Sequence, residues 1–360
     1  MKALEVVALG FTNRCNLSCI HCARDTGQET MLPELPAAFF LSVLAEAKNL
    51  GANKVNVTGG EIFCRKDCHE LISGAYCLGY SIGIETNGTL IGGDDLDRLM
   101  PFADRLRISF SVDGFTAETH DAIRGSGSFE RTMNTIRLAS GRGLNVRVIT
   151  VLNQSNLSEI PDMATYFAKD LGVGFRLIPN IMQYGRGVYA CNSIGVPYAE
   201  ARKLLEEFFF DFLREQNDDR HSIELNPALV PIDLRFHHVC PWGINMIGIG
   251  PAGIASLCHV SNWDSRFVFG DLTKTSLSEI WTKSPLLEKY RSQDPDSLHG
   301  VCGNCLARDV CRGGCRLHAV SRYGNDDLAP DPQCQTVYDL GLFPDHALED
   351  ETLMCAYPKE

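Results

Sequence analysis

Apolar stretches of strand length alternate with stretches of helical spacing through the first half of the chain. Strands are expected at residues 4–11, 54–58, 81–86, 106–112, 147–152 and 174–178. Apolar residues at helical spacing predict helices at 33–51 and near 94–103, 129–141 and 157–169. Six such βα repeats with buried strands form either a parallel barrel or an open sheet. The pattern therefore predicts an α/β fold for residues 1–199.

The alternation stops near residue 200, where the pattern changes character. Residues 200–235 are expected to form a helical connection, because an amphipathic segment near 200–215 is followed by the polar run NDDRHS. Cysteines become frequent from Cys240 onward. We therefore predict a small cysteine-rich domain at 236–345 and a C-terminal tail at 346–360.

Composition narrows the class of protein. The chain has 33 Lys and Arg against 45 Asp and Glu, a net charge of -12, which argues against a nucleic-acid partner. The first eleven residues lack the features of a signal peptide, and no run approaches the roughly 18 apolar residues that span a bilayer. We expect a soluble cytoplasmic protein without membrane contact. In that reducing compartment, 15 cysteines indicate metal ligands and not disulfides.

Three of these cysteines follow the first expected strand. Cys15, Cys19 and Cys22 form a C-x3-C-x2-C pattern. Three thiolates can hold a four-iron, four-sulfur cluster while leaving one iron without a protein ligand. The alternatives are a zinc site or buried core thiols, but no second cysteine pair follows Cys22 at the spacing of a zinc knuckle.

Other candidate residues follow the next three strands. Gly59, Gly60 and Glu61 follow the second strand, Thr86-Asn87-Gly88 the third, and Ser111 to Gly114 the fourth. In a parallel barrel all of these strand ends meet at one rim. Adjacent glycines allow the backbone to approach a ligand that a Cβ atom would exclude. We therefore expect the active site at this rim.

C-x3-C-x2-C near the N-terminus followed by Gly-Gly-Glu resembles the radical S-adenosylmethionine (SAM) superfamily. The resemblance covers nearly the whole chain and implies a partial (β/α)6 parallel barrel whose cluster chelates SAM and cleaves its sulfur–C5′ bond. It further implies which residues contact SAM. These are Gly59, Gly60 and Glu61 for the amino group, Ser111, Asp113 and Gly114 for the carboxylate and ribose, and Arg124 as a basic partner.

Two assignments near this rim have alternatives. Arg124 is equally well interpreted as a solvated arginine at a helix end. Asn153 ends the fifth strand and can touch SAM or substrate, but a turn-forming asparagine is the favoured interpretation. His21 lies between two cluster cysteines and is expected to shield the cluster, with a ligand or proton-relay role as the alternative.

The C-terminal cysteines resemble a second family. Cys240, Gly253, Cys258, Cys302, Cys305, Cys311, Cys315 and Cys334 give C-x12-G-x4-C, then C-x2-C-x5-C-x3-C, then a last cysteine, and SLSEIW lies between the two halves. This pattern resembles the SPASM domain of radical SAM enzymes that modify peptides and proteins. The resemblance implies two auxiliary four-iron clusters, one held by Cys302, Cys305, Cys311 and Cys334 and the other by Cys240, Cys258 and Cys315. Cys355 either completes the second cluster or is free, and a zinc ribbon is the alternative for residues 302–315.

Four cysteines have no place in these clusters. For Cys64, Cys68, Cys77 and Cys191 we expect core packing, because cysteine is often buried as a small hydrophobe. Cys64 lies close to the expected rim, so a redox or proton-donor role is the minor alternative.

Together the resemblances imply an oxidoreductase with three four-iron clusters that cleaves SAM to a 5′-deoxyadenosyl radical and abstracts hydrogen from a substrate C–H bond. The SPASM pattern favours oxidative modification of a ribosomally made peptide or protein, as in peptide maturases, with or without a separate peptide-recognition protein. A flavodoxin or ferredoxin-type protein is the expected reductant. Oxidation of a tetrapyrrole side chain in a haem-type pathway is the main alternative, and a non-catalytic electron carrier is a third.

Overall fold

The computed structural model describes residues 3–27, 33–224, 226–229, 237–324 and 326–349. The six expected strands are present and pair in parallel in chain order. Their bounds are β1 Val6–Thr12, β2 Lys54–Gly59, β3 Ser81–Thr86, β4 Leu106–Ser111, β5 Asn145–Val151 and β6 Gly174–Ile178. The predicted α/β fold with a parallel barrel core is thus confirmed.

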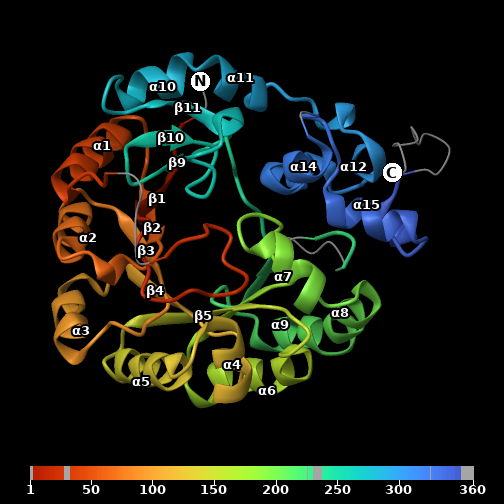
Figure 1. The fold of residues 1–360 in the computed structure, drawn as a ribbon, viewed down its shortest axis with the longest axis horizontal. Coiled ribbons are helices and arrows are strands. Elements are labelled where there is room, and N and C mark those ends of the chain that lie inside the picture. The colour runs from red at the N-terminus through yellow and green to blue at the C-terminus, as the bar shows by residue number, and fades with distance from the viewer. Residues whose placement is uncertain (1–2, 28–32, 225, 230–236, 325, 350–360) are drawn as a thin grey trace.

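Helices cover the outer side of this sheet (Figure 1). Alternate strand residues such as Ile108 and Phe110 are fully buried against them in one continuous apolar core. The described α-helices in this part of the chain are α1 Ala37–Asn49, α2 Cys68–Cys77, α3 Gly93–Leu99, α4 Ala117–Arg124, α5 Ser128–Gly141, α6 Ile160–Thr165, α7 Gly187–Ile194, α8 Tyr198–Leu204 and α9 Phe210–Gln216. The other strand residues face inward, toward the concave side of the sheet.

The expected helical connection contains a strand as well as helices, and a second strand follows it. β7 (Ser222–Glu224) pairs in parallel with β6, and β8 (His237–His238) pairs with β7. The helical connection predicted at 200–235 therefore also contains a strand, which the sequence did not indicate. Three residues of strand are too few to show a period of two, and β7 depends on its neighbour for its hydrogen bonds.

The cysteine-rich region begins by extending the barrel sheet at its other edge. β9 (Met246–Ile249) pairs in parallel with β1, and β10 (Ile254–Ser256) and β11 (Val268–Asp271) continue the sheet in antiparallel fashion. Over the described residues this gives the strand order β11-β10-β9-β1-β2-β3-β4-β5-β6-β7-β8, which does not close. The barrel is thus partial, and β9 places the region after Cys240 directly beside β1.

Short helices form the rest of the C-terminal region. They are α10 Leu277–Lys283, α11 Pro285–Arg291, α12 Gly300–Gly303, α13 Arg308–Cys311, α14 Arg316–Tyr323 and α15 Pro332–Asp339. α10 corresponds to the expected SLSEIW helix, and Ser276 caps it by accepting a hydrogen bond from the Glu279 amide. A separate small core around Val301, Val337 and Phe343 holds α12 and α15 together. The domain boundaries at 199, 235 and 345 stay predictions.

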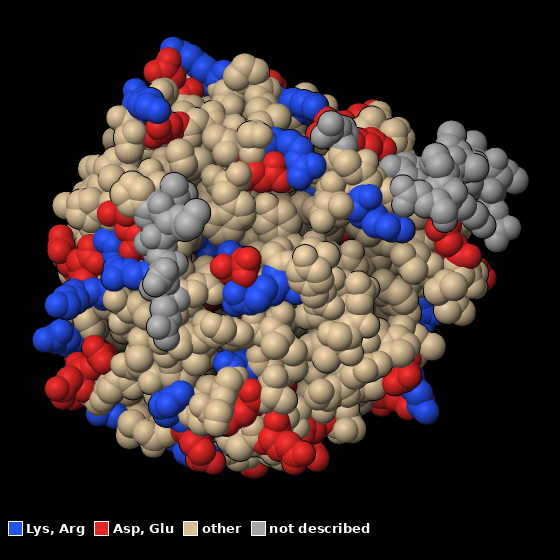
Figure 2. All heavy atoms as spheres, viewed as in Figure 1, with Lys and Arg blue, Asp and Glu red and all other residues tan. Residues whose placement is uncertain are grey.

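The described surface has no dominant charge on the face drawn in Figure 2, where acidic and basic side chains are interspersed. No helix in the described ranges has the length and apolar character needed to cross a bilayer.

Candidate active site

The loop that follows β1 gathers three thiols at the C-terminal rim of the barrel. Cys15 and Cys19 are buried and Cys22 is half-buried. Burial, with smaller contributions from Glu61 and from the nearby Cys19 and Cys22 thiols, raises the pKa of the Cys15 thiol to about 12. The Leu17 amide lies 3.5 Å from the Cys15 sulfur and donates to it. Three mutually close thiols with amide donors match the ligand set of an iron–sulfur cluster.

Arg186, the residue just before α7, holds this loop in place. Nε of Arg186 donates to the Cys19 carbonyl at 2.9 Å, and its Nη1 contacts Oδ1 of Asp25 at 2.7 Å. The Arg186 amide also donates to the Cys22 carbonyl at 3.0 Å. Local spacing could not reveal this role, because Arg186 lies 167 residues after Cys19.

Gly59 and Gly60 are required by the cluster loop itself. A Cβ atom on Gly59 would lie 2.5 Å from the Thr12 carbonyl oxygen, and one on Gly60 would lie 2.1 Å from that of Arg14. The Gly60 and Glu61 amides donate to these same two carbonyls at 2.8 Å. The close approach that the glycines permit is thus, first of all, an approach to the loop that carries Cys15.

Glu61 connects the second strand end to the third. Its side chain is fully buried and accepts hydrogen bonds from the Thr86 hydroxyl at 2.8 Å and the Asn87 amide at 2.7 Å. Asn87 in turn donates to Oδ1 of Asn16 in the cluster loop at 3.0 Å. Burial raises the pKa of Glu61, although these hydrogen bonds oppose the shift. Glu61 therefore positions the rim, and its contact with SAM stays a prediction.

Asp113 joins the fourth strand end to the cluster loop. Its buried carboxylate contacts Nε2 of His21 at 2.8 Å and Nε of Arg124 at 2.6 Å, and accepts from the Val151 amide at 2.9 Å. Burial alone would raise the pKa of Asp113, but Arg124 and His21 hold it well below its usual range. Asp113 is thus an anion at neutral pH.

The structure shows the surroundings of the three side chains near this rim for which the sequence left two roles open. Arg124 is nearly buried, bound to Asp113, and places Nη1 3.9 Å from the Cys19 sulfur, so the solvated interpretation is wrong. His21 points to Asp113 and ties the cluster loop to β4. Asn153 is buried and accepts from the Ser155 and Asn156 amides, as a turn-forming asparagine does. Ser111 ends β4 half-buried at the same rim.

His120, behind Asp113, provides a test by pH. Its Nδ1 accepts from the Asp113 amide at 3.2 Å, and burial with the nearby Arg124 charge lowers its pKa to about 4. Since the unfolded value is about 6.5, only the unfolded chain binds this proton as the pH falls from 6.5 toward 4, and folding stability declines. We expect about 1.5 kcal/mol of this decline between pH 6.5 and pH 5. In His120→Asn the amide oxygen can accept the same hydrogen bond but does not titrate, so urea unfolding of this variant should lack this loss of stability between pH 6.5 and pH 5. An equal dependence of the unfolding free energy on pH in both proteins would contradict the assignment.

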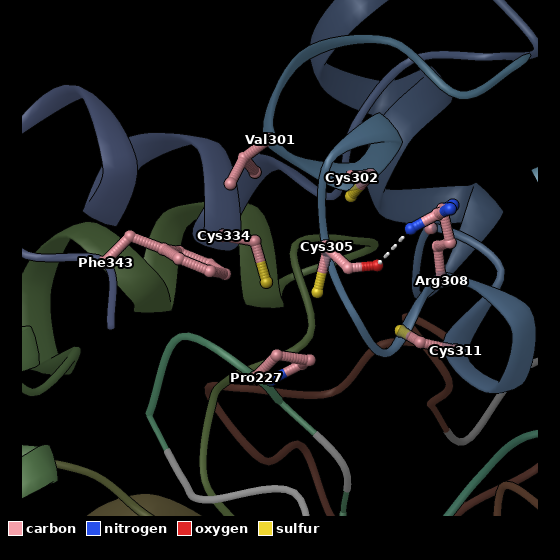
Figure 3. Close-up of a pocket in the computed structure, with 9 residues that line it drawn as sticks. Pro227, Val301, Cys302, Cys305, Arg308, Cys311, Cys334 and Phe343 are labelled. Atoms are coloured by element: carbon pink, nitrogen blue, oxygen red, sulfur yellow. Dashed lines mark hydrogen bonds between the residues drawn. The ribbon is translucent and has the colours of Figure 1, made fainter. Parts of the chain in front are cut away.

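Four C-terminal cysteines surround a single pocket (Figure 3). Cys302, Cys305, Cys311 and Cys334 line it together with apolar groups such as Val301 and Phe343 around about 250 Å³ of space, part of it open to solvent. The Asp331 amide donates to the Cys302 sulfur at 3.3 Å and the Ala307 amide to that of Cys305 at 3.4 Å. This is the cysteine set predicted for one auxiliary cluster, and the pocket fits such a group.

A second C-terminal group contains the other three predicted ligands. Cys240 is exposed, yet the surrounding protein, followed by the nearby Cys258 and Cys315 thiols, raises the pKa of its thiol. Burial followed by Cys258 raises the pKa of Cys315 to about 12. Cys355 lies outside the described residues.

Arg24 lies between the rim cluster loop and this second group. Its Nη1 donates to the His259 carbonyl, next to Cys258, at 2.5 Å, and its Nη2 donates to Oδ1 of Asn13 at 3.0 Å. The guanidinium interacts electrostatically with both the Cys22 and the Cys258 thiol. Sequence spacing could not reveal this connection, because 235 residues separate Arg24 from His259.

The thiol arrangement also bears on the zinc alternative. Within the described parts of the chain, no three histidine, cysteine, aspartate or glutamate side chains are gathered tightly enough to hold a single metal ion. Zinc needs ligands at about 2.0–2.3 Å, whereas an iron–sulfur cluster holds its thiolates around a larger body. Cys302, Cys305, Cys311 and Cys334 instead line a pocket of about 250 Å³, which is the larger space that a cluster needs.

The remaining cysteines follow the core-packing prediction only in part. Cys68 is buried in the core on α2. Cys64 and Cys191 are half-buried, and Cys77 is exposed at the end of α2. The prediction was therefore wrong for Cys77, because the helix turns this position to solvent.

Family comparison agrees with the two groups of motifs. Residues 9–167 match the radical SAM superfamily, and residues 240–306 match the SPASM iron–sulfur cluster-binding domain. The chain is a radical SAM protein with a C-terminal SPASM domain. The rim loop at Cys15, Cys19 and Cys22 lies within the first match, and Cys240, Cys258, Cys302 and Cys305 lie within the second.

Individual relatives of this radical SAM protein are named for different substrates. It is 29% identical to pre-heme d1 synthase of Dinoroseobacter shibae, over 91% of this chain and 85% of that protein. It is also 29% identical to mycofactocin maturase MftC of Mycobacterium ulcerans, over 91% and 86%. SuiB of Streptococcus suis, solved bound to SAM, has a TM-score of 0.75 at 18% identity, over 93% of this chain and 78% of that one, which supports the fold.

Proposed function

We propose that this protein reductively cleaves SAM and oxidatively modifies a ribosomally made peptide or protein. One observation carries the proposal: ten cysteines far apart in sequence form three groups, and the group of Cys15, Cys19 and Cys22 lies at the C-terminal rim of a parallel barrel. Active sites of parallel barrels lie at that rim. A plain electron carrier would have no use for the arranged strand ends around the three-thiol loop.

Distinct tasks follow for the residues at the rim. Cys15, Cys19 and Cys22 would hold a four-iron cluster, which supplies the electron that cleaves SAM to a 5′-deoxyadenosyl radical. The backbone of Gly59 and Gly60, together with Ser111 and Arg124, would contact SAM. Glu61 and Asp113 would fix these segments from beneath, through the hydrogen bonds to Asn87 and Arg124, in addition to any contact of their own with SAM.

The barrel interior would hold the substrate away from water and stray C–H groups, since a primary carbon radical reacts with almost any neighbour. Cys302, Cys305, Cys311 and Cys334 would hold one auxiliary four-iron cluster, and Cys240, Cys258 and Cys315 the other, with Cys355 as a candidate fourth ligand. Arg24 would be the charged group between the rim and the second of these.

We further propose a peptide or protein substrate, delivered directly or by a separate recognition protein, and a flavodoxin or ferredoxin-type reductant in the cytoplasm. A tetrapyrrole with propionate side chains is the second candidate substrate. Pre-heme d1 synthase is as similar to this chain as mycofactocin maturase MftC is, which keeps this candidate open.

The test is to reconstitute the protein without oxygen, count iron, add SAM and dithionite, and measure 5′-deoxyadenosine. Three clusters predict about 12 iron atoms per chain. About 12 iron with deoxyadenosine formed is the expected result. Bound zinc, or about four iron atoms without SAM cleavage, would overturn the proposal. Cys68→Ser, at a buried cysteine outside all three groups, should keep the full iron content.

A further inference from the structure

Three arginines occupy the inner face of the barrel. Arg107 on β4, Arg147 on β5 and Arg176 on β6 alternate with residues that pack against the outer helices, such as Val148 and Phe175. They therefore point to the concave side. Arg147 and Arg176 are only 9% and 8% exposed.

The strand register arranges these arginines in a diagonal row. Arg107 pairs with Asn145, two residues before Arg147, and Arg147 pairs with Gly174, two residues before Arg176. Each arginine thus lies two residues nearer the C-terminal rim than the one before it. Arg176 is two residues from the end of β6, so the row runs from the barrel interior toward the rim that carries the cluster loop.

Two of these three arginines have no hydrogen-bonding or ion-pair partner among the described residues. Arg176 contacts Glu224 at 2.5 Å. Arg107 and Arg147 make no hydrogen bond or ion pair with any residue that the structure describes, and the Nε atoms of all three arginines are buried without an acceptor. Lys54 adds a fourth positive charge close to the row. Glu85 is within electrostatic range of Arg107, Arg147 and Lys54, and Asp219 is within range of Arg107.

Buried charges of one sign are unfavourable unless something neutralises them. A buried guanidinium without a partner loses its hydration and gains no compensating bond. Native proteins rarely retain such groups, and where they do the group has a task. Guanidinium groups bind carboxylates through paired N–H donors, so a carboxylate is the natural partner of this row.

We propose that Arg107 and Arg147, with Arg176 and Lys54 beside them, bind a carboxylate of the substrate inside the barrel. The inference rests on the proposed function, because it treats the barrel interior as the substrate site. An acidic peptide side chain and a tetrapyrrole propionate share this chemistry. The arginine row would bind the carboxylate inside the barrel, below the rim. The reacting C–H bond of the substrate would then lie at the rim.

Stability measurements test whether the unpaired arginines form a binding site for a carboxylate. Arg147→Met keeps the stem and removes the unpaired charge, so the thermal midpoint of the reconstituted protein should rise by about 2 °C. Acetate, compared with chloride at equal ionic strength, should raise the midpoint of the native protein and not that of Arg147→Met. Arg137→Met removes an exposed arginine on α5 and should change neither result. A lower midpoint in Arg147→Met, or no response of the native protein to acetate, would overturn the proposal.

Binding measurements distinguish the two sources of the carboxylate. The probes are an N-acetylated hexapeptide with two glutamates against its glutamine counterpart, and a porphyrin with four propionates against its tetramethyl ester. We expect the native protein to prefer the acid form of one pair at least tenfold, and Arg147→Met and Arg107→Met to lose that preference while Arg137→Met keeps it. Equal affinities within both pairs would refute carboxylate recognition.

These outcomes are separable from those of the proposed function, because each protein preparation is first assayed for iron and SAM cleavage. Cleavage without carboxylate preference would overturn only the inference about the arginines. Carboxylate preference without cleavage would overturn only the proposed chemistry.

Discussion

Asp113→Asn is expected to lower the free energy of unfolding by about 3–5 kcal/mol, because it leaves a buried arginine without its counter-charge. The Asp113 side chain is fully buried and that of Arg124 is 10% exposed, with 2.6 Å between the paired atoms. Asparagine keeps the size of the side chain but cannot neutralise the guanidinium. Urea unfolding of the anaerobic reconstituted protein measures the effect.

Two further variants make the Asp113 prediction specific. Asp97→Asn removes a similar contact, 2.9 Å from Nε of Arg142, but at an exposed carboxylate, and should cost at most about 1 kcal/mol. Asp113→Asn combined with Arg124→Gln removes both charges and should recover much of the lost stability. If the urea midpoint of Asp113→Asn equalled that of the native protein, the buried pair of Asp113 and Arg124 would have no stabilising role.

The same substitution is expected to affect the cluster loop. Asp113 holds His21, which lies between Cys19 and Cys22, and it holds Arg124, whose Nη1 is 3.9 Å from the Cys19 sulfur. Both contacts weaken when the carboxylate becomes an amide, so the rim cluster should be lost more readily than the auxiliary clusters. Iron counts on the variant after unfolding and refolding would show this difference.

The barrel was predictable from the sequence because its strands are apolar and separated by well-formed helices. SIGIET and GFRLI became β3 and β6 with the predicted bounds. β7 was missed because three residues carry no period, and α2, α4 and α7 were missed because their apolar residues are few or interrupted by glycine and polar groups. The addition of β9 to β1 depends on pairing across 240 residues, which a local pattern cannot show.

The candidate site divides in the same way. The cysteines were predictable because the spacing of metal ligands can be recognised along the chain. Ten of the eleven predicted ligands lie in the predicted groups, and Cys355 lies outside the described residues. Arg24 and Arg186 were not, because each acts on a backbone carbonyl far away in sequence. The cluster of barrel arginines could not be predicted from the sequence either. Each arginine stands alone within an apolar strand, in LRISF, VRVIT and FRLI, and only the pairing register brings the three together.

Gly60→Ala is expected to remove the rim cluster while sparing the two auxiliary clusters. The new methyl group would lie 2.1 Å from the Arg14 carbonyl oxygen and 3.0 Å from Cβ of Cys15. These atoms belong to the backbone and to a cluster ligand, so relief requires the loop or the Gly-Gly-Glu segment to move. Moving either breaks the 2.8 Å bonds from the Gly60 and Glu61 amides to Thr12 and Arg14. We expect about four of about 12 iron atoms to be lost.

SAM cleavage by Gly60→Ala should fall by about 100-fold or more, since a displacement of about 1 Å at a reacting centre has an effect of this size. Iron analysis, electron paramagnetic resonance of the reduced protein and 5′-deoxyadenosine formation measure the result. Gly141→Ala is the matched control, because nothing lies within 4 Å of its added Cβ atom, and it should be neutral or stabilising by about 0.5–1 kcal/mol. Full iron and native cleavage in Gly60→Ala would mean that the loop tolerates the shift, and the glycine would then have to be explained by the ligand alone.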